Sequence, residues 1–223
     1  DIGSNPDKIY TKDYQAGALS FEIFSNDKKL ISNSGYYPDT KNRLNKLSKS
    51  TALQNTLSIE DYSSSDFIKS SNNFLIQKDL KIENKNIVFE KNYWKISASH
   101  NGYFKKFKLD HHREIEFYPE QFKFIGHDKI VRKDPDKQIK FDIRFHLHPD
   151  SKVMKTQNSK FILIQLEDEG WQFSCDNYDI NIDNGLYFGN KNSYQENQNI
   201  FISGMNNEIC LLYTSDAADD CRC

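Results

Sequence analysis

The chain has 223 residues, of which 13% are aromatic and 28% are charged, and its formal net charge is only −2. A protein that binds nucleic acid usually carries a basic excess on one face, and the interspersed charges of this chain argue against that class. No apolar run approaches the ~20 residues that a membrane-spanning helix needs. The length suits one domain with a single hydrophobic core.

Alternation of apolar and polar residues predicts strands along most of the chain after Gly17. Leu19 and Ile23 flank Phe21 at the period of a half-buried strand, and the stretch around Leu57 repeats this pattern. Residues that favour turns separate the apolar stretches. Further strands are expected at 87–89, 93–98, 103–109, 114–118, 121–125, 141–147, 161–166, 171–175, 178–182, 185–188 and 199–202.

A long succession of short strands predicts the fold class. We expect an all-β, two-sheet antiparallel β-sandwich (a supersandwich) with at most one or two short helices. The helix that we expect lies at 39–47, where Leu44 and Leu47 would share one side, and the polar stretch 63–73 is expected to be a loop. A jelly-roll carbohydrate-binding module of independent origin is the alternative architecture.

The last residues differ in composition from the rest of the chain. Up to residue 209 the sequence is rich in Asn, Lys, Ile and Phe, and it then continues as CLLYTSDAADDCRC. We therefore expect 1–209 to be the domain and 210–223 to be a non-native tail. Because Cys210, Cys221 and Cys223 all fall in this tail, no disulfide framework or zinc site is inferred from them. The chain does not begin with Met and is expected to have been cut from a longer one.

Short motifs in a fixed order carry a family resemblance. QAGALSFEIF at 15–24 is followed by NSGYY at 33–37 and STALQNTLSIED at 50–61. In order and spacing they resemble the start of the C-terminal β-sandwich domain of the heparinase II/III-like family of polysaccharide lyases. Later segments match that family in the same order, and on this basis the chain is identified as a member: DHHREIEFYPEQFKFIGHDKI at 110–130, IRFHLHP at 143–149, GWQF at 170–173 and QNIFISG at 198–204.

The resemblance bears on a metal site. In metal-binding members, two histidines and an aspartate of the opening motifs converge on a zinc ion, and the matching positions here are Gln15, Asn33 and Gln54. Neutral amides are poor zinc ligands, but each can both donate and accept hydrogen bonds. The resemblance thus implies that the zinc is lost, that no cofactor is needed and that the amides form a hydrogen-bonded cluster. The alternative is three unrelated surface amides.

The resemblance also bears on catalysis. Lyases of this class work by β-elimination, which needs neutralisation of a uronate carboxylate, a base for the C5 proton and an acid for the leaving O4. In the family these groups lie largely on a helical toroid domain N-terminal to the sandwich, so the chain alone is expected to be inactive. Asp13 matches a position where some members place a histidine and is the candidate base. The alternative for Asp13 is a solvated loop residue.

Two polar stretches are candidates for substrate contact. Because apolar residues alternate inward along 141–147, Arg144, His146 and His148 are expected to share the opposite face. Arg144 could meet a sugar carboxylate in a bidentate fork, and the histidines could bind a metal. His112 and Arg113 form a second such stretch. Three roles remain open for both stretches: structural hydrogen bonding or packing against the toroid, contact with an acidic sugar, and metal binding.

Two functions of different classes follow. The first is one wall of the substrate cleft in a lyase of acidic polysaccharide, such as a glycosaminoglycan. The second is a non-catalytic module that binds glycan or supports the toroid. The glutamines Gln15 and Gln54 favour the second function, and the retained IRFHLHP favours the first. The expected partners are acidic polysaccharide and the toroid domain, without nucleic acid or membrane. The resemblance implies a bacterial protein of the periplasm or cell envelope.

Overall fold

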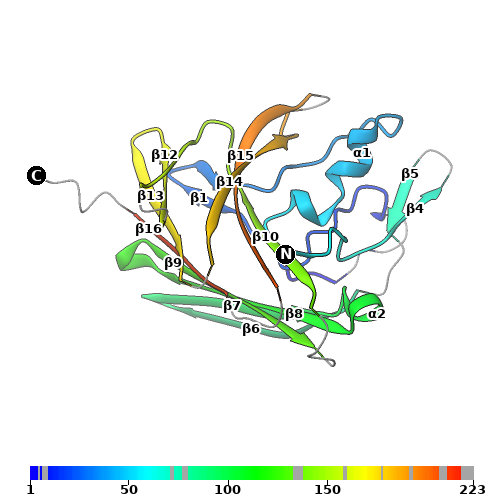
Figure 1. Ribbon diagram of the computed structural model, residues 1–223, viewed down its shortest axis with the longest axis horizontal. Helices are drawn as coiled ribbons and strands as arrows, with labels where there is room; N and C mark the ends of the chain where they lie inside the picture. Colours follow the sequence, from blue (N-terminus) through cyan, green and yellow to red (C-terminus); the bar gives the residue numbers. More distant parts are fainter. Residues whose placement is uncertain are drawn as a thin grey trace, which may run out of the picture.

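The computed structural model describes residues 1–4, 6, 10–70, 73–76, 80–132, 138–157, 160–176, 178–190, 193–205 and 210–216. Antiparallel strands dominate this part of the chain, and the α-helices in it are the short α1 (Arg43–Ser48) and α2 (Phe104–Phe107). The two main sheets form the sandwich (Figure 1). The predicted all-β class is confirmed. Within the described residues, no helix is long and apolar enough to cross a membrane.

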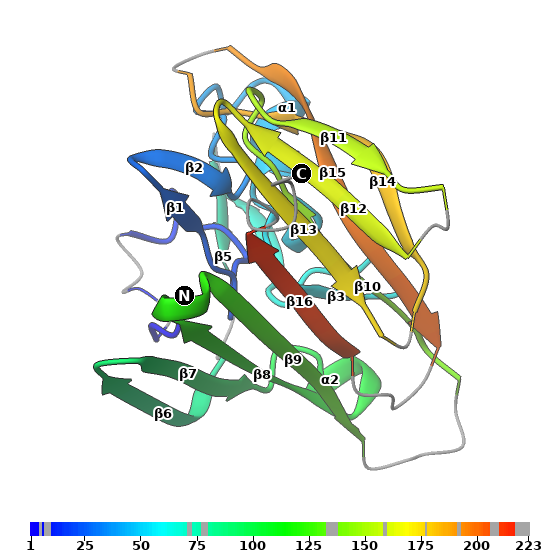
Figure 2. The ribbon, with the colours of Figure 1, turned by 90° about the vertical axis from the view of Figure 1, so that its left-hand side faces the viewer.

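The larger sheet has eight strands, which follow one another across the molecule (Figure 2). Each strand pairs antiparallel with its neighbours. In spatial order they are β11 (Lys152–Lys155), β12 (Phe161–Leu166), β13 (Glu169–Cys175), β16 (Cys210–Asp216), β9 (Lys123–Arg132), β8 (Leu109–Tyr118), β7 (Tyr93–His100) and β6 (Ile82–Glu90).

The smaller sheet has four strands with β10 at its interior. Ile143 on β10 lies opposite Ile202 on one side and Leu57 on the other. Within the described residues, two further hairpins lie outside these sheets. The order in the smaller sheet is β14 (Ile180–Tyr187), β15 (Gln195–Met205), β10 (Lys140–His146) and β3 (Leu57–Ile59), and the hairpins are β1 (Ile23–Ser25) with β2 (Lys28–Ile31) and β4 (Phe67–Ser70) with β5 (Asn73–Ile76).

The hydrophobic core lies between the two sheets. Alternate residues of β10 point into it, as the period-2 pattern predicts, and Phe141, Ile143 and Phe145 are at most 1% exposed. The ring of Phe145 packs against that of Phe173 on β13, with centroids 5.2 Å apart, and so joins the sheets. Burying one such side chain contributes about 1.5–3 kcal/mol to folding. The core therefore fixes which face of β10 looks outward.

The strand predicted at 103–109 is wrong. Helix α2 occupies Phe104–Phe107, and β8 begins only at Leu109. Tyr103 is buried, and its hydroxyl donates to the Leu57 carbonyl at 2.7 Å. Lys108 then ends the helix in the left-handed region, with φ of 56°. Burial and anchoring of the Tyr103 ring outweigh the local strand preference of the aromatic residues.

Other boundaries also differ from the prediction. The stretch 63–73 is not entirely a loop, because β4 pairs with β5 there. Leu19 adopts φ of 60°, so the first strand begins at Ile23. Helix α1 begins later than position 39 because Asn42 caps it, accepting a hydrogen bond from Leu44 N–H at 3.0 Å.

Residues 210–216, expected to belong to a non-native tail, form β16 between β9 and β13. Strand pairing depends on backbone groups, so a segment of suitable β propensity fills this position whatever its origin. The origin of the tail therefore stays a prediction. Cys221 and Cys223 lie outside the described residues.

Candidate functional site

Three loop segments meet beside the smaller sheet. Ala16 N–H donates to the Lys49 carbonyl at 2.9 Å, and Ser34 N–H donates to the Leu53 carbonyl at 3.1 Å. A further backbone bond, from Ser32 N–H to the carbonyl at the end of β10, ties these loops to the sheet. We call this assembly the loop junction, and it comprises residues 13–21, 33–37 and 49–56.

The loop junction contains the amides that match the family's metal positions. Gln54 is 2% exposed, and its Nε2 donates to Gln15 Oε1 at 3.2 Å. Asn33 does not bond directly to this pair; its Oδ1 accepts from the backbone N–H of Asn55 at 2.7 Å, one residue beyond Gln54. The structure thus brings two of the amides together by a side-chain hydrogen bond and holds the third against the same segment.

These side chains do not fit a zinc ion. Zinc sites in proteins use thiolate, imidazole and carboxylate groups, and Gln15, Asn33 and Gln54 supply neutral amides that already use hydrogen-bonding atoms on one another or on the backbone. In the part of the chain that the structure describes, no three His, Cys, Asp or Glu side chains converge in a way that would hold a metal. No chemical step is therefore assigned to a metal.

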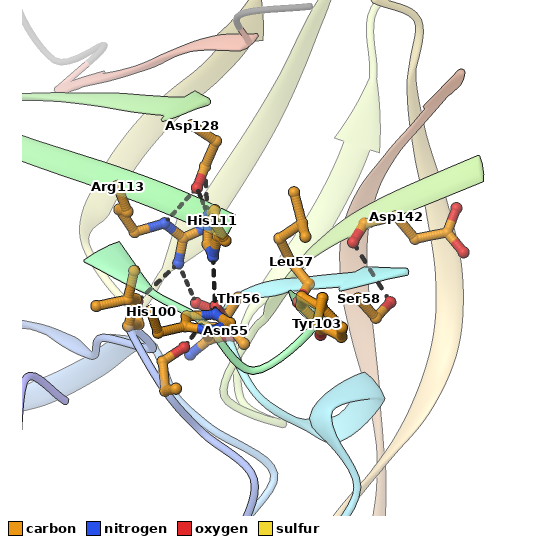
Figure 3. Close-up of polar contacts among 12 residues, drawn as sticks. Asn55, Thr56, Leu57, Ser58, His100, Tyr103, His111, Arg113, Asp128 and Asp142 are labelled. Carbon is orange, nitrogen blue, oxygen red and sulfur yellow. Dashed lines mark hydrogen bonds and ion pairs between the residues drawn. The ribbon is translucent and has the colours of Figure 1, made fainter. Parts of the chain in front are cut away.

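Asn55 connects the loop junction to both sheets (Figure 3). It is completely buried, and its Nδ2 donates to the Phe21 carbonyl at 2.9 Å while its Oδ1 accepts from His146 N–H at 2.6 Å. Its backbone carbonyl accepts from Arg113 Nη1 at 2.6 Å. A buried amide that uses donor, acceptor and backbone groups in this way specifies a single loop conformation.

Arg113 lies inside the molecule, paired with Asp128 (Figure 3). Its Nε donates to Asp128 Oδ1 at 2.8 Å and its Nη2 to Oδ2 at 2.9 Å, which is a bidentate fork. Its Nη1 also donates to the carbonyls of Leu19 and Asn55. Arg113 was a candidate for sugar contact, but at 5% exposure with these partners it serves as an internal clamp. That expectation is corrected.

Two histidines extend the network from Asp128. Gly102 N–H donates to His100 Nδ1 at 3.0 Å, so the His100 ring carries its proton on Nε2 and directs it at His111 Nδ1, 3.2 Å away. His111 in turn donates from Nε2 to Asp128 at 2.5 Å. Burial lowers the pKa of His111, although Asp128 opposes this. Each of the two histidines therefore accepts at Nδ1 and donates from Nε2, so both nitrogens of each buried ring have a hydrogen-bond partner.

The charge on Asp128 is stabilised by its partners. Complete burial alone would raise the pKa of this carboxyl, but the Arg113 guanidinium and the His111 hydrogen bond outweigh burial and hold the pKa well below its usual range. Asp128 is thus an anion between Arg113 and a neutral His111. The network is a structural unit that is almost completely buried, and it is not an acid–base pair for a substrate.

His146 is also buried, although the alternation on β10 predicts an open polar face. Its Nε2 donates to the Ala52 carbonyl at 2.9 Å, and its Nδ1 accepts from Ser34 Oγ at 3.2 Å. Burial lowers its pKa to about 4. The loop junction covers this end of the strand, so His146 cannot meet a glycan. This candidate is corrected as well.

The remaining candidates keep some exposure but do not converge. Arg144 donates to Asn199 Oδ1 at 2.7 Å and lies 3.4 Å from Asp183 Oδ2. His148 lies near the end of β10, where its Nδ1 is 3.3 Å from Asp150 Oδ2. His112 lies on β8, in the larger sheet, and its outer face is separate from that of the smaller sheet, where Arg144 lies. Arg144 and His148 share an outer face, and His112 does not join them.

Asp13 lies on the exposed rim of the loop junction. Its side chain is 61% exposed, and its closest cation in an ion pair is Lys12, at 3.9 Å. Its backbone N–H donates to the Tyr10 carbonyl at 3.3 Å. Asp13 is accessible to a substrate. The described contacts of His100, His111 and His146 are with other groups.

An apolar cleft of about 240 Å³ opens between the loop junction and the larger sheet. Its walls include Phe21 from the junction and Trp94, Ile96 and Phe117 from β7 and β8. Most of this lining suits apolar packing, and the Lys95 and Arg113 side chains in it are already in ion pairs. The cleft is therefore not assigned to the acidic sugar.

Sequence reasoning missed several residues that organise the junction. Asn55 stands inside a quoted motif, and its capacity to donate and accept was a usable signal. Asp128 lies inside the matched segment 110–130, but neither its role nor that of His100 could be read locally, because their partners lie on other strands. Lys49 had none either, since lysine is almost never fully buried.

The fold and the site define a class: an antiparallel β-sandwich domain with a loop junction fixed by a buried polar network. The chain belongs to the heparinase II/III-like family, because it matches the family model described as Heparinase II/III-like, C-terminal, over residues 1–221. No curated protein matches it.

Solved structures support the same fold. The chain is similar to the heparan sulfate lyase HepC from Pedobacter heparinus, with a TM-score of 0.73 and 13% identity over 91% of this chain and 30% of that one. It is also similar to the Heparinase III-BT4657 gene product, with a TM-score of 0.70 and 15% identity over 91% of this chain and 30% of that one. At these identities the likeness concerns the fold alone. The chain spans about 30% of the length of these proteins.

Proposed function

We propose that the chain is the C-terminal domain of a lyase that cleaves acidic, uronate-containing polysaccharide, such as a glycosaminoglycan, by β-elimination. The observation that carries the proposal is family membership over residues 1–221 together with a loop junction in which Asn55 and Arg113 are fully engaged. The domain forms one wall of the substrate cleft.

The reaction requires groups that the described residues do not bring together. Elimination needs a cation or hydrogen-bond donor for the uronate carboxylate, a base for the C5 proton and an acid for O4. Asp13 is an exposed carboxylate, and Arg144 is the accessible guanidinium among the candidates. A helical toroid domain, preceding this one in the parent protein, supplies the remaining groups. The 223-residue chain alone is therefore inactive.

An eliminase assay tests this proposal. The purified chain and the parent protein that contains it are incubated with heparan sulfate or alginate, and ultraviolet absorbance reports unsaturated uronate. We expect product from the parent and none from the chain, because positioning of the missing groups accounts for several powers of ten in rate. Product from the chain alone, or no product from the parent on any uronate polysaccharide, contradicts the proposal.

A non-catalytic module that binds glycan is the second candidate. It is favoured by Gln15 and Gln54, neutral amides at positions where metal-binding members of the family carry histidine. Binding to immobilised heparin then depends on Arg144. Arg144→Gln should weaken binding at low salt, and Arg43→Gln, at an exposed position on α1, is the matched control. Binding by an inactive parent would favour this candidate over the lyase.

We also propose that the loop junction works without a metal. The Gln15–Gln54 hydrogen bond takes the place of metal ligation, and an unpaired buried amide costs about 1–3 kcal/mol. Gln54→Ala should therefore lower the free energy of unfolding by about 1–3 kcal/mol. EDTA should leave the melting temperature unchanged. Stoichiometric zinc in the purified chain by elemental analysis contradicts this proposal.

For location, we propose the bacterial periplasm or cell envelope, where a lyase meets external polysaccharide. The proposal rests on family resemblance. Fractionation of the native host followed by immunodetection of the parent protein tests it, and recovery in the cytoplasm alone would refute it.

A further inference from the structure

Lys49 is a buried lysine at the centre of the loop junction. It follows α1 as the C-terminal capping residue, and its relative exposure is 0%. Its Nζ donates to the Lys12 carbonyl and, at 3.3 Å, to the Tyr14 carbonyl. The same Nζ lies 4.8 Å from the centroid of the Tyr36 ring. Within the described ranges no carboxylate oxygen lies within 4 Å of it.

Such an environment is unusual for an ammonium group. Lysine is rarely buried without a carboxylate partner, because loss of hydration is costly. Here carbonyl dipoles and the face of an aromatic ring replace water. Burial lowers the pKa of Lys49 to about 8, and the charge of Asp13 opposes the shift. At neutral pH the group is therefore a cation, and it is held by the backbone of another segment.

The contacts of Lys49 fix residues that reach the surface. Tyr14 and Lys12, whose carbonyls it binds, flank the exposed Asp13. Asn45, one helical turn before Lys49 on α1, donates to the Tyr36 hydroxyl at 3.0 Å. Tyr36 is thus held at its hydroxyl and at its ring from the same helix. The Nζ that contacts the Tyr36 ring also binds the carbonyls on either side of Asp13. The charge of Asp13 raises the pKa of Tyr36, although burial raises it more.

We propose that Lys49 is a positioning residue whose buried ammonium acts as an internal cation, holding Asp13 and Tyr36 together on the rim of the loop junction. A carboxylate beside an aromatic ring is an arrangement that meets a sugar, with the ring stacking and the carboxylate accepting from a hydroxyl. The glycan as ligand rests on the proposed function. The positioning role of Lys49 does not.

Hydrogen exchange of the full 223-residue chain tests the positioning role. Lys49→Met keeps the unbranched stem but removes the ammonium group and its charge, and Lys49→Arg keeps the charge. Lys46→Met changes an exposed lysine of the same helix and is the control. We expect amides of residues 13–17 to exchange at least about tenfold faster in Lys49→Met, because a tenfold change corresponds to about 1.4 kcal/mol, the scale of a charged hydrogen bond. Strands β12 and β13 should be unaffected.

Rescue separates a role of the charge from simple packing. Lys49→Arg should retain most of the protection, and Lys46→Met should retain all of it. Protection of 13–17 in Lys49→Met equal to that of the original chain would overturn the proposal, since the methylene stem alone would then suffice. Loss of protection in Lys49→Arg as large as in Lys49→Met would also overturn it.

A titration of the unmodified chain keeps the test valid if Lys49→Met does not fold. The titratable groups that face Lys49 are Asp13, Tyr14 and Tyr36, and burial raises the pKa of both tyrosines above their usual value. Between pH 7 and 9, Lys49 is thus the group expected to titrate, and the amide NMR shifts of 13–16 should follow it with a midpoint near pH 8. Shifts that stay constant across this range would refute the proposal. Neither readout involves a polysaccharide, so failure of the lyase proposal would leave this one standing.

Discussion

At the scale of single residues, the buried charges decide how the loop junction is held. Arg113 binds Asp128 through a bidentate fork and reaches the carbonyls of Leu19 and Asn55, so one guanidinium joins β8, β9 and two loops. Breaking a buried pair leaves one charge without compensation, which costs more than the pair itself contributes. The stability of the junction should therefore respond most strongly to changes at this pair.

Asp128→Asn tests that dependence. The variant leaves the Arg113 guanidinium buried without an anion, and the free energy of unfolding should fall by about 3–5 kcal/mol. Urea denaturation measures it. Glu114→Gln is the control, because Glu114 pairs with Lys95 at 3.0 Å on a partly exposed face, where an ion pair contributes about 0–1 kcal/mol. Equal losses in the two variants would contradict the assigned role of Asp128.

His146 predicts a dependence of stability on pH. Its pKa is about 4 in the folded chain and about 6.5 when unfolded, so between these values the unfolded state binds the extra proton. Stability should therefore fall as pH decreases from about 6.5 to 4, by up to about 3 kcal/mol, and His111 adds to the fall because burial lowers its pKa too. His146→Gln should flatten the dependence, and His148→Gln, at a partly exposed imidazole, should not. A slope unchanged in His146→Gln would show that other groups cause the dependence.

At the scale of elements, short helices interrupt a chain that otherwise forms strands. Helix α2 exists because Tyr103 is anchored under β3 and Lys108 adopts a left-handed conformation that turns the chain into β8. Neither condition can be read from residues 103–109. The alternation of Tyr, Phe and Leu is compatible with a strand. The helix forms because the Tyr103 hydroxyl is hydrogen-bonded to the distant Leu57 carbonyl, a partner that the local sequence does not reveal.

Lys108→Gly tests the cost of this left-handed residue. Glycine adopts positive φ without steric strain, so the variant should gain about 0.5–1 kcal/mol in stability. Lys105→Gly, within the same helix, should lose about 0.5–1 kcal/mol instead, because glycine is unfavourable in a helix interior. Thermal denaturation of both variants measures the difference. A loss of stability in Lys108→Gly would mean that the lysine side chain contributes more than its backbone strain costs.

At the scale of the whole molecule, one strand late in the chain joins the two parts of the larger sheet. Strand β16 pairs with β9 on one side and β13 on the other, so β11–β13 connect to β6–β9 through it. Figure 2 shows this strand between β9 and β13. Removing it would expose two long unpaired strand edges, which favour aggregation.

Truncation tests the role of β16. A chain that ends at Met205 should lose cooperative thermal unfolding and should aggregate, whereas a chain that ends at Asp216 should unfold as one unit. Size-exclusion chromatography and calorimetry report both properties. Cooperative unfolding of the shorter chain would show that the larger sheet is stable without β16. It would also support the prediction that 210–223 is a non-native tail.

The amino-acid sequence alone determined the fold class and the family of this chain. Period-2 alternation depends on which side of a strand each residue occupies, a local property, and it was sufficient to predict that strands dominate and which face of β10 points inward. The order of the motifs was sufficient to identify the heparinase II/III-like family.

Only the tertiary structure decided what covers each outward face. Alternation placed Arg144 and His146 on the same side of β10, but the loop junction covers His146 and leaves Arg144 partly exposed. The same holds for Arg113 and Lys49, whose partners lie on segments far away in the sequence. Burial of a polar group is favourable only when its partners are positioned around it, and those positions are set by the packing of loops and sheets.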